Sequence, residues 1–266
     1  MGEIALGQYY PSNSILHRLD PRVKILWTLV YIVSVFLVKG VYGYVYCAAV
    51  LAALIILSKV PFRFILKSMK PILFILIVTM LFNIFLTPGE EIARWWIFRV
   101  TREGMVHAVR MAIRLSFLVM GSSIMTLTTT PNALTDGMER QLGFLKVLHV
   151  PVHEISMMMS IALRFIPILM EETDKIRKAQ MARGADFESG GFIRRMRSMI
   201  PLLVPLFVSA FRRANDLAMA MEARCYHGGA GRTQMKPLRY APRDFAAYGI
   251  MAAFLAGIVF FSLTGL

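Results

Sequence analysis

Two arginines stand between small residues near the ends of two basic segments of this 266-residue chain. The two tripeptides are Ala182-Arg183-Gly184 and Ala223-Arg224-Cys225. A guanidinium at a helix end, without bulky neighbours, can be inserted into a pocket on another protein. Its planar donors can there form two hydrogen bonds to one carboxylate. These residues therefore favour docking on a partner protein, and so a role in coupling.

The alternative role for each arginine is that of a helix cap. The negative end of the helix dipole favours a nearby cation by about 0.3 to 1 kcal/mol. Gly184 also suits a helix C-terminus, because glycine takes a positive φ without strain. Either arginine alone fits capping as well as docking, whereas two such endings on neighbouring helices favour docking.

Motifs of catalytic chemistry are incomplete in this sequence. The run 153–157 begins like the HExxH motif of zinc proteases, but Met157 stands where the second histidine belongs. The run 227–233 resembles a phosphate loop, but Tyr226 stands in place of the first glycine and Arg232 in place of the lysine. Two cysteines make neither a disulfide framework nor a metal site. We expect no catalytic residue, cofactor or metal on this chain.

The composition is that of an integral membrane protein. Hydrophobic residues make up 57% of the chain and the mean hydropathy is +0.59, above the roughly half-apolar usage of soluble domains. Lys and Arg number 30 against 16 acids, and these cations lie between apolar runs. This arrangement favours loops beside anionic lipid and argues against nucleic acid as a partner.

Five apolar runs approach the roughly twenty residues that a membrane-crossing helix needs. They cover residues 24–39, 43–58, 71–87, 105–127 and 245–264. The loop between the second and third runs carries four Lys or Arg and no acid, so the positive-inside rule places it in the cytoplasm. The N-terminus and the stretch after the fourth run are then cytoplasmic too.

The long stretch between the fourth and fifth runs is neither low-complexity nor polar enough to be disordered. Proline and glycine signals predict three helices in it, from about 131 to 148, 151 to 183 and 191 to 226. We predict an all-α integral membrane protein with about five transmembrane helices and a three-helix cytoplasmic coupling domain inserted before the last span. The predicted domains are 1–127, 128–243 and 244–266.

Two features of this layout leave alternatives open. The apolar segments 155–170 and 199–211 could form a spanning or re-entrant hairpin, but their charged linker would then lie outside, which the positive-inside rule disfavours. We expect both to lie along the inner membrane face. Arg110 and Arg114 share one face of the fourth span, where a charge at the bilayer centre costs about 2.5 to 3.5 kcal/mol. We expect them to face protein, with an ion pathway as the alternative.

Taken together, these features resemble a known family. The N-terminal residues that carry the likeness are Tyr10-Pro11, Ser14, His17, Leu19-Asp20-Pro21-Arg22 and Lys24. With the five-span layout and the two Ala-Arg endings, they resemble the T component of energy-coupling-factor transporters over essentially the whole chain.

The resemblance implies a non-catalytic subunit in a prokaryotic plasma membrane. Such a subunit joins a substrate-binding membrane component, the S component, to two cytoplasmic ATP-binding-cassette ATPases for uptake of vitamins or metal ions. ATP and Mg²⁺ would be bound by the ATPases, and this chain would carry no cofactor. The resemblance assigns ATPase docking to Arg183 and Arg224 with their neighbours Ala182, Gly184 and Ala223.

One position departs from the family pattern. Cys225 stands where the family has glycine, which leaves the backbone turn after Arg224 undetermined. The alternative function is a self-sufficient membrane transporter or a membrane-embedded enzyme.

Overall fold

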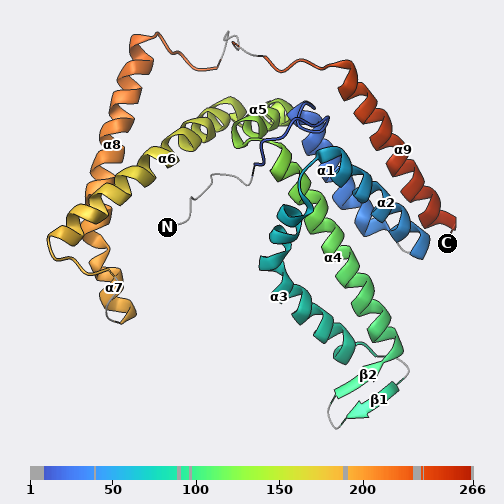
Figure 1. The fold of residues 1–266 in the computed structure, drawn as a ribbon. Coiled ribbons are helices and arrows are strands. Elements are labelled where there is room, and N and C mark those ends of the chain that lie inside the picture. The colour runs from blue at the N-terminus through green and yellow to red at the C-terminus, as the bar shows by residue number, and fades with distance from the viewer. Residues whose placement is uncertain are drawn as a thin grey trace. The chain divides into compact units, whose positions relative to one another are not determined.

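A computed structural model describes residues 9–38, 40–88, 91–95, 98–187, 191–229, 235 and 237–264. Contacts divide the chain into two units, which are described separately. The first unit comprises Met1–Arg140 and Leu238–Leu266, and the second comprises Gln141–Pro237. Figure 1 shows the helices of both units.

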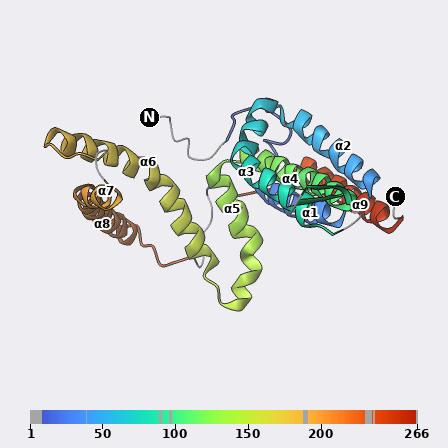
Figure 2. The same ribbon diagram turned by 90° about the horizontal axis from the view of Figure 1, so that it is seen from below.

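The first unit is a bundle of apolar helices. Its helices are α1 (Pro21–Leu37), α2 (Val41–Ser58), α3 (Phe62–Leu86), α4 (Arg102–Thr128), α5 (Pro131–Gln141) and α9 (Pro242–Thr264). Helix α4 packs against α1, α2 and α3, and α9 packs against α1 and α2. Figure 2 accordingly shows α4 at the centre of this bundle.

Aromatic residues fill the core of the bundle around Phe254 of α9. Its ring stacks on Trp27 and Tyr31 of α1 and on Tyr46 of α2, with centroids 5.4 to 6.1 Å away. Gly121 of α4 makes room for Tyr31, because a Cβ built there would lie 2.1 Å from the ring. The missing side chain lets α1 and α4 approach closely, as small residues do between membrane helices.

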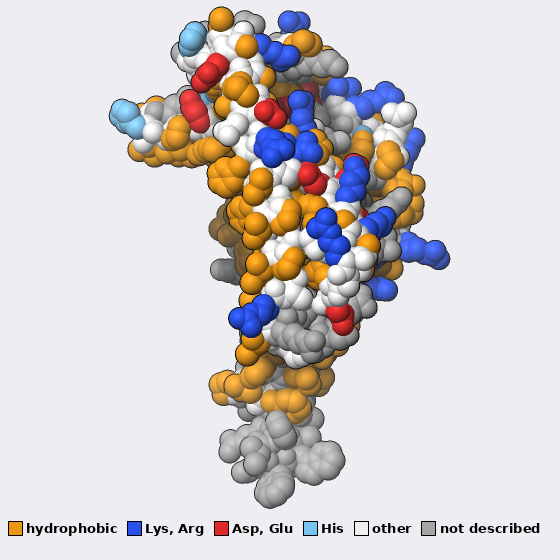
Figure 3. Space-filling model, turned by 90° about the vertical axis from the view of Figure 1, so that its left-hand side faces the viewer, with side chains coloured by type: hydrophobic (Ala, Val, Ile, Leu, Met, Phe, Trp, Pro, Cys, Tyr) orange, Lys and Arg blue, Asp and Glu red, His pale blue; other side chains and the backbone are white. Residues whose placement is uncertain are grey.

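The helices of the first unit expose many large hydrophobic side chains. Ile56 and Phe74, for example, are 76% and 74% exposed. Figure 3 shows another face of the molecule, on which hydrophobic side chains lie among Lys and Arg. Helices α2, α3, α4, α6 and α9 are long and apolar enough to cross a membrane. The prediction of a helical membrane protein with five candidate spans is confirmed. The five differ in one member from the predicted runs, because α1 has only 17 residues and is not among them, whereas α6 is.

Two local differences from the sequence expectation concern the third span and the loop after it. Helix α3 begins at Phe62, nine residues before the start of the predicted run, and continues through Pro71. Beyond α3, residues predicted as loop form an antiparallel hairpin of β1 (Glu91–Trp95) and β2 (Phe98–Thr101). Thr101 then caps α4 by accepting a hydrogen bond from the amide of Gly104 at 3.1 Å.

The second unit consists of the 3-10 helix η1 (Leu142–Leu148), α6 (Val152–Ala182), α7 (Phe192–Ser198) and α8 (Ile200–Ala223). The third predicted helix is thus split at Met199, because Pro201 lacks the amide that would continue the α7 ladder. The first predicted helix becomes α5 followed by η1, and α5 groups with the first unit. The division into a membrane part and a coupling domain at 128–243 stays a prediction.

Candidate functional site

The end of α6 forms a complete Schellman cap around Arg183. Gly184 lies in the left-handed region with φ of 86°, and its amide donates to the carbonyl of Met181 at 3.0 Å. The next amide, that of Ala185, donates to the carbonyl of Gln180 at 2.9 Å. This pattern ends a helix sharply while it satisfies two carbonyls of the last turn. Arg183, in the cap position, is exposed.

The end of α8 has the same cap around Arg224. Cys225 takes the left-handed position with φ of 55°, and its amide donates to the carbonyl of Glu222 at 2.9 Å. The amide of Tyr226 donates to the carbonyl of Met221 at 3.0 Å. The backbone turn that the sequence left undetermined is therefore the turn that glycine makes at the end of α6. Within the described ranges, no residue forms an ion pair with Arg183 or Arg224.

Helices α6 and α8 cross, and polar side chains join them at the crossing. Arg213 donates through Nη2 and Nε to Glu172 Oε2, at 2.9 and 3.2 Å. Ser209 Oγ donates to the other oxygen of Glu172 at 2.5 Å. Further along, Gln180 Nε2 donates to the carbonyl of Pro201 at 3.4 Å. The helices run antiparallel, so the end of α6 lies beside the start of α8 (Figure 1).

The segment of each helix from the crossing to its arginine, which we call its arm, has the same length in α6 and α8. Eleven residues separate Glu172 from Arg183, and eleven separate Arg213 from Arg224. At 1.5 Å per residue each arm is about 16 Å long. The two arginines thus mark opposite ends of a crossed pair.

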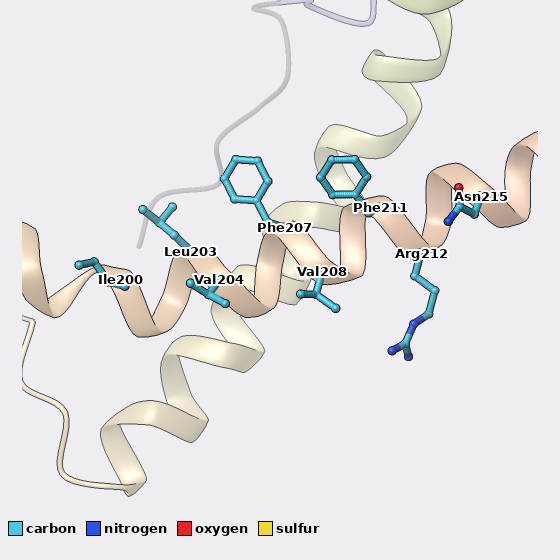
Figure 4. A pocket seen from close by; sticks show the side chains of 8 residues that line it. All are labelled: Ile200, Leu203, Val204, Phe207, Val208, Phe211, Arg212 and Asn215. Carbon is cyan, nitrogen blue, oxygen red and sulfur yellow. The ribbon is translucent and has the colours of Figure 1, made fainter.

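A cavity and a groove lie along the crossed helices. A cavity of about 710 Å³ lies beside Arg224, between the end of α8 and Met157, Ile161 and Phe165 of α6. A groove runs along the front half of α8, where Phe207 and Phe211 stand on one side of the helix and Val204, Val208 and Arg212 on the other (Figure 4). The two phenylalanines are 62% and 67% exposed.

The N-terminal signature ties the start of α1 to the rest of the first unit. The amide of Tyr10 donates to the carbonyl of Leu127 at 2.9 Å. Lys24 Nζ donates to the carbonyl of Thr128 at 2.9 Å. His17 donates through Nε2 to the carbonyl of Tyr10 at 2.9 Å, so its Nδ1 accepts from Ser14 at 2.7 Å. These contacts fasten the segment before α1 to the end of α4.

Asp20 and Asp244 join the starts of α1 and α9. Asp20 caps α1 and pairs with Arg22 at 2.8 Å. Its own amide donates to Asp244 Oδ1 at 2.9 Å, and Asp244 is 1% exposed. The Arg22 guanidinium lies 3.8 Å from the ring centre of Tyr240, a cation–π contact. Burial would raise the pKa of Asp20, but the hydrogen bonds from Arg22 outweigh it and hold the pKa below its usual value.

The motifs set aside in the sequence gain no catalytic geometry. Over the residues that the structure describes, no group of three His, Cys, Asp or Glu side chains is placed to hold a metal ion. Most of the run that resembles a phosphate loop, 230–233, lies outside the described residues. The features that stand out in their place are two capped helix ends with exposed arginines and an apolar helical bundle, and the five candidate spans are those of a multi-pass membrane protein.

Comparison with known proteins narrows this class to one family. The family model described as cobalt transport protein (CbiQ) matches residues 12–236. The chain is 53% identical over 247 residues to a protein of Clostridium kluyveri named energy-coupling factor transporter transmembrane protein EcfT, with 92% of each chain covered. Proteins of the same name from Ruminiclostridium cellulolyticum and Bacillus subtilis are 50% and 45% identical, covering 97% and 98% of this chain and 96% and 98% of their own.

The chain therefore belongs to the CbiQ family, as a transmembrane protein of the energy-coupling factor type. The sequence resemblance is confirmed. Membership makes the chain a non-catalytic, multi-pass transporter component, in place of a membrane-embedded enzyme.

Proposed function

We propose that this chain couples two cytoplasmic ATP-binding-cassette ATPases to a substrate-binding membrane subunit, and that Arg183 and Arg224 each dock into one ATPase. The observation that carries the proposal is the pair of matching caps at the ends of two arms of equal length. Two similar helix ends are better explained by two similar partners, such as a pair of ATPases, than by a single partner. The neighbours Ala182, Gly184, Ala223 and Cys225 keep the approach to each guanidinium open.

Coupling follows from the crossing of α6 and α8. When the ATPases close on ATP and Mg²⁺, their docked helix ends move. Because Glu172 and Arg213 join the helices at their crossing, the motion of both ends turns the two helices about this common point. The front halves of α6 and α8 then move as well. The front half of α8 carries the exposed groove at Phe207 and Phe211, which we assign to the substrate-binding subunit.

The orientation that serves this function places the N-terminus and the second unit in the cytoplasm. The cations at 59–70 support it through the positive-inside rule. The cargo is a vitamin or a metal ion that the substrate-binding subunit selects. A self-sufficient transporter is the second candidate, and uptake by the isolated chain in proteoliposomes would favour it.

The test is a double charge reversal, Arg183→Glu with Arg224→Glu, in the full complex. We expect the variant to insert in the membrane but to lose the ATPases on purification and to lose transport. The matched control, Lys175→Glu with Lys178→Glu, makes the same change of charge at exposed positions of α6 one to two turns before its end, and it should keep both. Equal loss in the control, or normal transport by the double reversal, would reject the docking assignment.

A further inference from the structure

Three basic side chains of α4 line one pocket of the first unit. His107, Arg110 and Arg114 follow at helical spacing, so they share one face of α4. They meet Phe36, Val38 and Tyr44, from the end of α1 and the start of α2, around a cavity of about 340 Å³. This size falls within the range of small-molecule sites, roughly 300 to 1,000 Å³.

Arg114 anchors the floor of the pocket. Its Nη2 donates to the carbonyl of Val38 and to the hydroxyl of Tyr44, both at 3.1 Å. Its Nε is buried, and in the described part of the chain no acceptor reaches it. Arg114 thus joins α4 to the end of α1 and the start of α2, which agrees with the expected protein-facing role.

His107 and Arg110 meet no Asp or Glu among the residues that line the pocket. Both are exposed, and no described residue forms an ion pair with Arg110 or Arg114. Glu103, the acid nearest along the same face, lies one turn before His107 and does not line the cavity. Two arginines on one face of an apolar span are costly unless an anion or water compensates their charge. The pocket therefore has the charge of an anion site.

The position of the pocket identifies the anion. A turn between two antiparallel apolar helices lies at the membrane surface, because its backbone polar groups need water or a polar partner. Lipid phosphates lie at that level, and basic pockets between membrane helices bind anionic headgroups. Phe36 and Met111, 58% and 39% exposed, give the rim an apolar contact for the glycerol and the first methylenes of a lipid.

We propose that this pocket binds the phosphodiester headgroup of an anionic phospholipid, held by Arg110 and His107 above the fixed guanidinium of Arg114. The pocket shares no residue with the arginine-ended helices, so this proposal can be tested independently of ATPase docking. Arg114 also has a structural role, and the test therefore leaves it unchanged.

The experiment is native mass spectrometry of the full-length chain in detergent, titrated with dioleoylphosphatidylglycerol. We expect one tightly retained lipid, and the double variant His107→Gln with Arg110→Gln should bind it at least about tenfold more weakly, because charge-assisted hydrogen bonds are lost. The control Lys67→Gln with Lys70→Gln removes two exposed cations of α3 and should leave binding unchanged. Dioleoylphosphatidylcholine should be retained more weakly by the unaltered chain.

Four results would overturn the proposal. Equal binding by the unaltered chain and the pocket variant would remove the site, and equal loss in the control would make the effect one of general charge. Displacement of the lipid by millimolar inorganic phosphate would assign the pocket to the free ion. If the pocket variant retained the lipid but no longer co-purified with a membrane partner of the unaltered chain, the pocket would be assigned to an acidic protein surface.

Discussion

Replacing Cys225 with glycine should stabilise the end of α8 without changing what it presents. A left-handed conformation costs an ordinary L-residue roughly 1 to 2 kcal/mol, and Cys225 adopts it with φ of 55°. Glycine avoids that cost but loses more backbone entropy on folding, about 0.5 to 1 kcal/mol. The net gain is on the order of 0.5 to 1 kcal/mol.

The reverse exchange at the end of α6 is the matched control. Gly184 has φ of 86°, and a Cβ built there meets no atom within 4 Å. Gly184→Cys therefore isolates the backbone cost, and we expect it to lower stability by a similar amount. In a thermal melt of the purified chain the two variants should shift the midpoint in opposite directions, each by a few degrees at most, at about 2 to 4 °C per kcal/mol for a chain of this size. Shifts of the same sign would refute the conformational argument.

Two further predictions concern the first unit. Because the hydrogen bonds from Arg22 lower the pKa of Asp20 in the folded chain, this carboxylate stabilises the fold fully above its unfolded pKa, and the contribution is lost as pH falls through the lower folded pKa. Melts of the unaltered chain at decreasing acidic pH should show the loss, and Asp20→Asn should flatten it. Gly121→Ala should destabilise the bundle by about 1 to 3 kcal/mol through overpacking against Tyr31, whereas Gly249→Ala in α9, where an added Cβ meets nothing within 4 Å, should not lower the melting midpoint.

Sequence patterns predicted the helices because apolar runs and proline signals act locally. They could not predict contacts made across the chain. Asp20 was part of the family signature, but its partner Asp244 is 224 positions away and lies in the first turn of a span, where it gave no signal. The hairpin at Glu91–Thr101 was missed because its balanced charges are also typical of a loop.

Of the two arginine-bearing helix ends, one could be predicted from local sequence and the other could not. Gly184 signalled its own turn, since glycine favours positive φ. Cys225 has no such preference, and only the bonds from its own amide and that of Tyr226 to the last turn reveal that the two caps match. The equal arms also depend on where Glu172 meets Arg213, which no local pattern encodes. Docking by the two ends therefore stays a prediction for the experiment above.

The bond from the Asp20 amide to Asp244 has a consequence for biogenesis. The first helix leaves the ribosome early, yet the acceptor at its start is translated only after the whole second unit. The start of α1 therefore gains this acceptor only after α9 has begun to be made, and a chain that stops before residue 244 lacks the bond that joins the starts of its first and last helices.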